Sequence, residues 1–122
     1  MKIFLSSYGL KGGMNPHPKH GVDFYVDCRQ VCEPPSGSPS GDDKETQAFI
    51  EQRTNFKPIM ECIIQALERI PSRRGEMKDP YSKPFHIAFF CAWGVHRSRA
   101  AKHIVGERLK AYLKDRHEVI IQ

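Results

Sequence analysis

The sequence has no long hydrophobic run. Hydrophobic residues make up 39% of its 122 residues, but the longest apolar stretch, residues 87–93, is far too short to span a bilayer. The opening MKIFLSS is shorter than a secretory signal peptide. We therefore expect a cytoplasmic protein with no membrane partner. A Walker-type glycine-lysine loop is also missing, which excludes P-loop nucleotide binding within these residues.

Cysteine is scarce, and its spacing does not suggest a disulfide framework. The four cysteines stand at positions 28, 32, 62 and 91, as fits a reducing compartment. Cys28 and Cys32 form a CxxxC pair, but no second pair of ligands follows it, so we expect no metal site. No other pattern indicates a cofactor.

Charge is the strongest compositional signal. The formal net charge is +5 and the sequence pI is near 9.1, which favours anionic partners. Nucleic acid and phosphorylated small molecules both satisfy this condition, and composition does not choose between them. A length of 122 residues predicts one domain over residues 1–122, long enough to bury a single core.

Strand and helix patterns alternate along the chain. The order predicts an α/β domain with a short, mostly parallel sheet flanked by helices. Asp42 or Asp43 is suited to cap the first helix, and Pro58 to open the second. Residues 71–84 and the proline- and glycine-rich residues 10–21 are predicted loops. The expected strands cover residues 2–9, 22–29, 85–92 and 118–122, and the expected helices cover 44–53, 58–70 and 97–114.

The stretch CAWGVHRS, residues 91–98, combines a strand end, a glycine-containing loop and a helix N-terminus. This arrangement binds anions, because backbone N–H groups of the loop converge on one oxyanion. Arg97 would grip the anion bidentately, and Gly94 would permit the turn. Basic residues at a helix N-terminus oppose the helix dipole, which suggests a negative ligand; they are His96, Arg97, Arg99, Lys102 and His103. The alternative is a buried strand-end cysteine beside a solvated basic helix start.

Parallel strands present their carboxyl ends at one edge of the sheet, where ligands gather. Asp27 and Cys91 both stand at such ends, so we expect them in one pocket. Asp27 could act as a general acid, bind a sugar hydroxyl, or form an ion pair with Arg29. Trp93 is expected to pack in the core, with a stacking surface over the pocket as the alternative.

Three separated blocks resemble the RapZ C-terminal domain family in order and spacing: SSYGLKGG at residues 6–13, YVDCR at 25–29 and FCAWGVHRS at 90–98. The resemblance implies an α/β domain that binds small regulatory RNAs and glucosamine-6-phosphate, and that tends to form homo-oligomers. Residues 30–37, QVCEPPSG, depart from the family, which carries a histidine in this loop. The pocket residues carried over onto this chain are Lys11, Asp27, Arg29, Cys91, Gly94, His96, Arg97 and Ser98.

Several of these residues keep two interpretations. Lys11 is either a phosphate contact or a solvated loop charge, and His96 either donates to the anion or positions the loop. Ser98 is either an ordinary first-turn residue or a partner of the Cys91 sulfur.

The last long helix carries a basic stripe opposite its apolar side. The stripe is either a solvated face or an RNA footprint, and the footprint would extend to the basic loop residues of 71–84. The RNA-binding candidates are Arg99, Lys102, His103, Lys110 and Lys114, whereas Ala101, Ile104, Val105, Leu109 and Leu113 face the core.

We therefore expect a regulatory domain that binds a sugar phosphate, an RNA backbone, or both, at residues 91–98. The short loop also resembles the signature of cysteine-dependent phosphatases. In that alternative, Cys91 is the nucleophile, Arg97 the phosphate clamp and Asp27 the general acid. A third interpretation is an interaction or assembly module that no longer uses its pocket.

Overall fold

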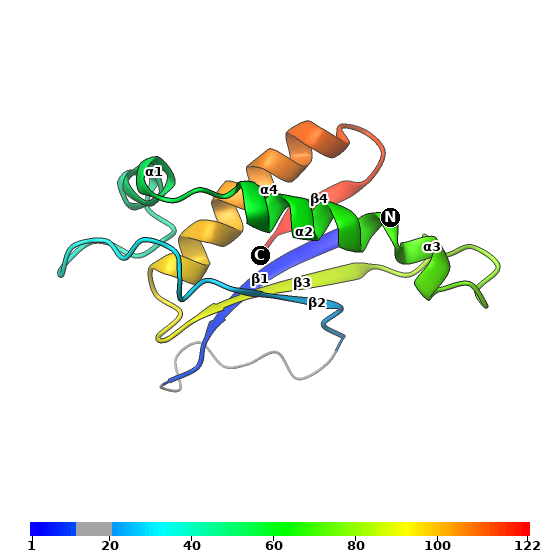
Figure 1. Cartoon of the computed structure of the whole chain (residues 1–122), viewed down its shortest axis with the longest axis horizontal. Coiled ribbons are helices and arrows are strands. Elements are labelled where there is room, and N and C mark those ends of the chain that lie inside the picture. Colours follow the sequence, from blue (N-terminus) through cyan, green and yellow to red (C-terminus); the bar gives the residue numbers. More distant parts are fainter. Residues whose placement is uncertain (12–20) are drawn as a thin grey trace.

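The strands of the described chain form one fully parallel sheet. The computed structural model describes residues 1–11 and 21–122, so most of the predicted 10–21 loop lies outside the described residues. The strand order is β2-β3-β1-β4, which confirms the predicted parallel α/β arrangement (Figure 1). The strands are β1 (Lys2–Gly9), β2 (Phe24–Asp27), β3 (Phe85–Cys91) and β4 (Glu118–Ile121).

The first two helices begin close to the residues that were predicted to cap or open them. The Asp43 carboxylate accepts hydrogen bonds from the N–H groups of Glu45 and Thr46 and so caps the first helix. Pro58 lies in the first turn of the second helix, where its missing N–H costs nothing. A short helical turn opens the predicted 71–84 loop. The helices are α1 (Lys44–Arg53), α2 (Lys57–Glu68), α3 (Ile70–Arg73) and α4 (Arg97–Leu113).

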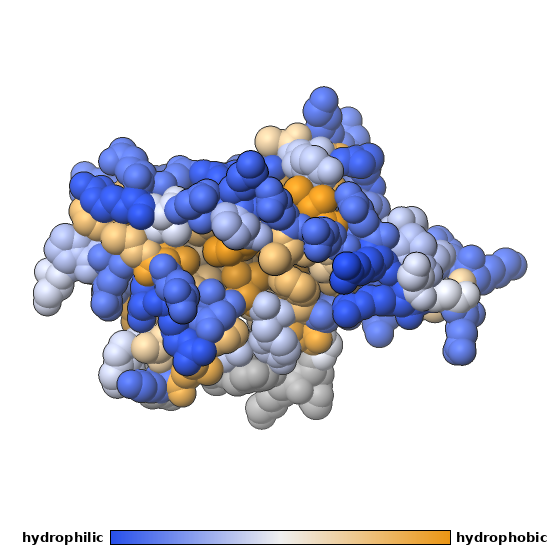
Figure 2. Space-filling model, viewed as in Figure 1, coloured by the Kyte–Doolittle hydropathy of each residue, from blue (hydrophilic) through white to orange (hydrophobic). Residues whose placement is uncertain are grey.

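α2 and α4 cover one face of the sheet, and α1 packs against α4 (Figure 1). Side chains alternate along a strand, so every second residue of β1 and β3 points into this layer. The core contains Ile3, Leu5 and Phe89 from the sheet, each fully buried. On the face seen in Figure 2, hydrophilic residues cover most of the surface, and hydrophobic atoms show near the middle, around α2. The predicted core side of α4 is buried as expected, at Ala101, Ile104, Val105, Leu109 and Leu113.

The strand register aligns the carboxyl ends of the central strands. Gly9 pairs with Cys91, and Asp27 pairs with Phe90. Pairing continues past β1, because the Leu10 N–H donates to the Cys91 carbonyl at 3.0 Å and the Lys11 N–H to that of Ala92 at 2.7 Å. Three sequence-distant segments therefore meet at one edge of the sheet. No helix of the described residues has the length and apolarity to cross a membrane.

Candidate functional site

Residues 91–98, hereafter the anion loop, are organised around the buried sulfur of Cys91. The Gly94 and Ser98 N–H groups both donate to Cys91 Sγ, at 3.2 and 3.4 Å. The thiol lies 3.1 Å from Ser98 Oγ, which in turn donates to the Tyr8 carbonyl at 3.4 Å. Ser98 is fully buried. The sulfur thus acts as a cap for the first turn of α4, supplied from the preceding strand.

The turn of the anion loop depends on two glycines in contact. Gly94 has φ +73°, a conformation that side-chain-bearing residues rarely adopt. A Cβ atom on Gly94 would lie 2.5 Å from the Gly9 nitrogen, and one on Gly9 would lie 2.4 Å from the Trp93 carbonyl carbon. The predicted role of Gly94 is therefore supported by packing as well as by φ.

The loop leaves N–H groups available at its helix end. Among the described residues, we find no protein acceptor for the backbone N–H groups of Val95, His96 and Arg97. The first N–H groups of any helix lack partners within the helix, and the helix dipole adds positive potential there. The geometry suits a small oxyanion at the start of α4.

Arg97 joins the anion loop to the end of β2. Its guanidinium donates to the Arg29 carbonyl at 2.7 Å, which leaves its other N–H groups for a further acceptor. The Asp27 carboxylate is held by Arg29, with nitrogen–oxygen distances of 3.0, 3.2 and 2.8 Å. The structure thus brings Asp27, Arg29, Cys91 and Arg97 to one edge of the sheet. The sequence rule on the carboxyl ends of parallel strands predicted this for Asp27 and Cys91.

The ionisation of Asp27 limits its chemistry. Hydrogen bonds from the Arg29 side chain and backbone, together with the charges of Arg29 and Arg97, hold the pKa of Asp27 below its ordinary value despite partial burial. A general acid must carry a proton at the working pH, which requires a raised pKa. In this arrangement Asp27 acts as the ion-pair partner of Arg29.

The remaining predicted pocket residues surround the loop. The Lys11 ammonium lies 5.9 Å from the centroid of the Trp93 ring. His96 Nε2 lies 3.0 Å from the Ser38 carbonyl, so this nitrogen must carry the proton and the ring positions the loop. Trp93 is 60% exposed. The expectation that it packs in the core is wrong, because Trp93 lies in the loop between β3 and α4 and not on an element whose face is turned to the core.

Comparison with known families gives a match over almost the whole chain. The family model of the RapZ C-terminal domain matches residues 1–121. The chain belongs to this family. Membership points to a regulatory role that involves binding a nucleotide or a sugar phosphate. No curated protein gave a significant match to the chain.

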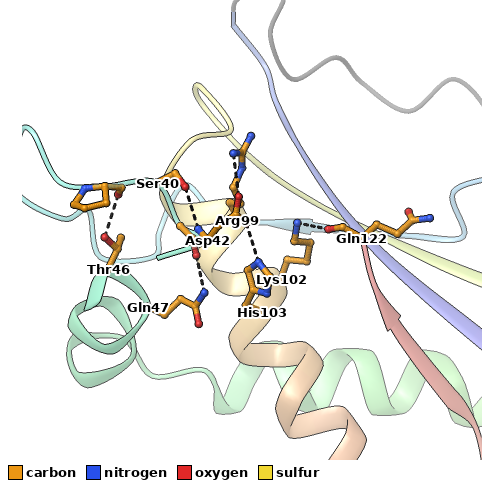
Figure 3. Close-up of polar contacts among 10 residues, drawn as sticks. Ser40, Asp42, Thr46, Gln47, Arg99, Lys102, His103 and Gln122 are labelled. Atoms are coloured by element: carbon orange, nitrogen blue, oxygen red, sulfur yellow. Dashed lines mark hydrogen bonds and ion pairs between the residues drawn. The ribbon is translucent and has the colours of Figure 1, made fainter. Parts of the chain in front are cut away.

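In this RapZ C-terminal domain, the basic residues of the first turns of α4 have protein partners (Figure 3). Asp42 accepts from Arg99 at 3.2 Å and from His103 at 2.8 Å, and the Lys102 ammonium donates to the Gln122 carbonyl. Burial opposes ionisation of Asp42, but the His103 hydrogen bond and the neighbouring cationic charges outweigh it and lower its pKa. These charges are therefore not evidence for a ligand, contrary to the sequence-based argument.

The predicted basic stripe on α4 is interrupted. Lys102 is only 6% exposed, and burial lowers its pKa, so the prediction of an exposed stripe is wrong at this position. Arg99 and His103 bind Asp42, which leaves Lys110 and Lys114 as exposed members. In the 71–84 loop, the Arg74 guanidinium donates to the carbonyls of residues 80, 83 and 84 and so holds the loop together.

Sequence reasoning missed Tyr8, whose carbonyl anchors Ser98. Burial, with smaller effects from Tyr25 and Asp27, raises the pKa of the Tyr8 hydroxyl. Its ring centroid lies 5.5 Å from that of Phe90. The sequence feature that could have identified Tyr8 is its position directly before Gly9, at the carboxyl end of the predicted strand 2–9. In the part of the chain that the structure describes, no group of three or more potential ligands is arranged to hold a metal ion.

Proposed function

We propose that this domain is a regulatory module that binds a phosphate-bearing ligand at the anion loop, with a sugar phosphate such as glucosamine-6-phosphate as the first candidate. The observation that carries the proposal is the set of N–H groups at residues 95–97, for which no acceptor is found among the described residues, in a loop that also carries the Arg97 guanidinium at the start of α4. Amide donors and a bidentate arginine together suit a phosphate monoester. Membership of the RapZ C-terminal domain family supports the same ligand class.

The cysteine-dependent phosphatase remains the alternative that the site supports less well. Its mechanism needs Cys91 as nucleophile and a protonated carboxyl to release the leaving group. Asp27, the carboxyl at this edge, has a lowered pKa and is held by Arg29. We therefore expect binding without turnover.

The test is calorimetric titration of the domain with inorganic phosphate and glucosamine-6-phosphate. Arg97→Ala should weaken binding of both by about 10-fold or more, since a charge-assisted hydrogen bond contributes roughly 1.5–3 kcal/mol. Arg73→Ala, which removes an exposed arginine at the end of α3, is the matched control and should change nothing. Equal affinity in the wild type and Arg97→Ala refutes the proposal. Aryl phosphate hydrolysis that a thiol alkylator blocks would establish the phosphatase instead.

An RNA backbone is the second candidate ligand, and a basic cleft at the other end of α4 favours it. The cleft has a volume of about 710 Å³ and is lined by Lys2, Lys110, Lys114 and Arg116, among others. Asp115 and Glu118 also line it, so its positive charge is partly offset. Cationic side chains around an open cleft suit phosphate contacts rather than base recognition.

RNA binding of this kind should weaken steeply with salt, because it releases counterions from the phosphates. Lys114→Ala should lower the affinity for single-stranded RNA and reduce the slope of affinity against salt. Lys57→Ala, at an exposed lysine of α2, is the matched control. Binding that is sequence-selective and almost independent of salt would contradict this candidate.

A further inference from the structure

Cys28 and Cys91 lie opposite each other at the carboxyl ends of two neighbouring strands. Asp27, the last residue of β2, pairs with Phe90 of β3, and the Cys28 N–H continues the pairing by donating to the Phe90 carbonyl at 2.8 Å. One step further along both strands, Cys28 is therefore the partner of Cys91. Neighbouring strands are about 4.8 Å apart, which falls within the span of about 4.4–6.8 Å between the Cα atoms of a disulfide.

The two thiols also share one face of the sheet. Residues that pair on neighbouring strands point to the same side, and both cysteines are free and buried, with Cys28 0% and Cys91 3% exposed. Burial raises the pKa of the Cys28 thiol, and the neighbouring Cys91 and Asp27 side chains raise it further. The two sulfur atoms are therefore close enough to affect each other's ionisation.

The Cys91 sulfur holds the anion loop in its observed shape. It accepts the Gly94 and Ser98 N–H groups at 3.2 and 3.4 Å, and its thiol donates to Ser98 Oγ at 3.1 Å. A bond from Cys91 to Cys28 requires the Cys91 side chain to turn toward β2 and away from these groups. Buried N–H groups without an acceptor are costly, so the loop must then rearrange.

We propose that Cys28 and Cys91 form a reversible disulfide when a peroxide oxidises the domain, and that this bond switches the anion loop out of its binding conformation. Formation of the disulfide does not depend on any ligand. Only the expected loss of anion affinity rests on the proposed function. Transient disulfides of this kind are the ones that occur in reducing compartments.

The oxidation proceeds in two balanced steps. The peroxide first converts the Cys91 thiol to a sulfenic acid and releases one water. Cys91 reacts first because a thiolate is the reactive form, and the raised pKa of Cys28 keeps its thiol protonated. The Cys28 sulfur then attacks the Cys91 sulfur, the S–S bond forms, and the hydroxyl leaves with the Cys28 proton as a second water. The two thiols together lose two electrons and two protons to the peroxide.

The geometry also makes the bond easy to reverse. Paired residues on parallel strands hold their Cβ atoms about as far apart as the strands, about 4.8 Å. A relaxed disulfide prefers about 3.5–4.5 Å between Cβ atoms. The bond is therefore strained, and strained disulfides are the ones that thiols reduce readily.

The first experiment maps the linkage. Hydrogen peroxide in small molar excess, later removed with catalase, should lower the intact mass by two hydrogen atoms. Proteolysis should give a peptide pair that joins Cys28 to Cys91 and separates with dithiothreitol. The double variant Cys32→Ser, Cys62→Ser, which removes the half-buried and the exposed cysteine, is the matched control and should give the same linkage. A Cys28–Cys32 linkage, or thiols that remain free, overturns the proposal.

The second experiment reads the state of the loop. Trp93 is the only tryptophan of the chain and lies in the anion loop, so its emission reports the loop without a ligand. The emission should change when the disulfide forms and recover with dithiothreitol. The affinity for inorganic phosphate should fall by about 10-fold or more in the oxidised form, since the loss of one hydrogen bond to an anion has about that effect.

Cys28→Ala separates the disulfide from oxidation of Cys91 alone. The reduced variant keeps Cys91 and its loop contacts, so it should bind phosphate with the affinity of the wild type. With no second thiol, prolonged peroxide should carry Cys91 to a sulfinic acid, which dithiothreitol does not reverse. Recovery with dithiothreitol in Cys28→Ala, equal to that of the wild type, would contradict the proposed role of Cys28.

The switch and the phosphate site can fail separately. A Cys28–Cys91 disulfide that leaves both the Trp93 emission and the phosphate affinity unchanged overturns the switch. If the reduced domain does not bind inorganic phosphate at all, the proposed function fails. The Trp93 emission then still decides whether the disulfide rearranges the loop.

Discussion

Among the positive-φ glycines of the described residues, Gly94 is the one whose replacement with alanine should destabilise the domain most. Two separate costs arise. Gly94 has φ +73°, a left-handed conformation that costs an L residue about 1–2 kcal/mol. The added methyl would also lie 2.5 Å from the Gly9 nitrogen and 2.7 Å from the Tyr8 carbonyl carbon. Both are backbone atoms of a central strand, so they cannot move aside as a flexible side chain would.

The chain contains a control that isolates the packing cost. Gly21 also has φ +73°, but an added Cβ there meets no atom of the described residues within 4 Å. Gly21→Ala should therefore cost only the conformational term, about 1–2 kcal/mol. Gly94→Ala should cost about 2–5 kcal/mol, because overpacking adds typically 1–3 kcal/mol. A domain of this size loses roughly 4 °C in Tm for each kcal/mol.

The assay is thermal unfolding followed by circular dichroism, with urea titration as an independent measure. We expect Tm to fall by about 4–8 °C in Gly21→Ala and by about 8–20 °C in Gly94→Ala. Gly94→Ala should also bind phosphate more weakly at a temperature where it is fully folded, because the loop must shift away from Gly9. Equal Tm values for the two variants would refute the argument that the Gly9–Gly94 contact shapes the anion loop.

Three other predictions follow from the described contacts. Cys91→Ser should bind phosphate with an affinity within a few-fold of the wild type, because the serine hydroxyl also accepts hydrogen bonds from the loop N–H groups. Cys91→Val offers no acceptor and should lose phosphate binding, as calorimetric titration would show. Asp42 has a lowered pKa in the folded state, so its contribution to stability is fully present above its ordinary pKa of about 4 and is lost as the pH falls below that value through the lowered one; the Tm gap between wild type and Asp42→Asn should be constant near neutral pH and narrow progressively in acid. Lys102→Met leaves the Gln122 carbonyl without its donor, and urea titration should show a loss of about 1–3 kcal/mol, against almost none for Lys110→Met at an exposed position.

The strands and helices could be predicted from the sequence where short-range rules, such as apolar runs and helix caps, decide the local structure. The continuous apolar run of β3 indicated a buried strand, and both Ala88 and Phe89 are fully buried. Asp43 capped α1 because its carboxylate reaches the orphan N–H groups of the first turn. The grouping of Asp27 with Cys91 followed from the rule that parallel strands align their carboxyl ends.

Contacts between distant residues could not be predicted in this way. Helical periodicity placed Arg99 and Lys102 on an outer face, but it contains no information about Asp42, which lies 57 residues from Arg99 in the sequence. Trp93 is a large apolar residue of the kind found in cores, but its place in the loop between β3 and α4 leaves it exposed. The partners of charged and aromatic residues thus depend on the assembled fold.

The parallel pairing of β1 with β3 has a consequence for synthesis on the ribosome. The hydrogen bond between Ser6 and His86, on these two strands, spans 80 residues of sequence. At a translation rate of about 5–20 residues per second, the first strand waits roughly 4–16 seconds for its central partner to be made. During that interval Ile3 and Leu5, which are fully buried in the finished domain, have no sheet to join. The nascent chain therefore exposes an apolar strand for seconds, and we expect it to depend on chaperones that bind such segments until β3 emerges.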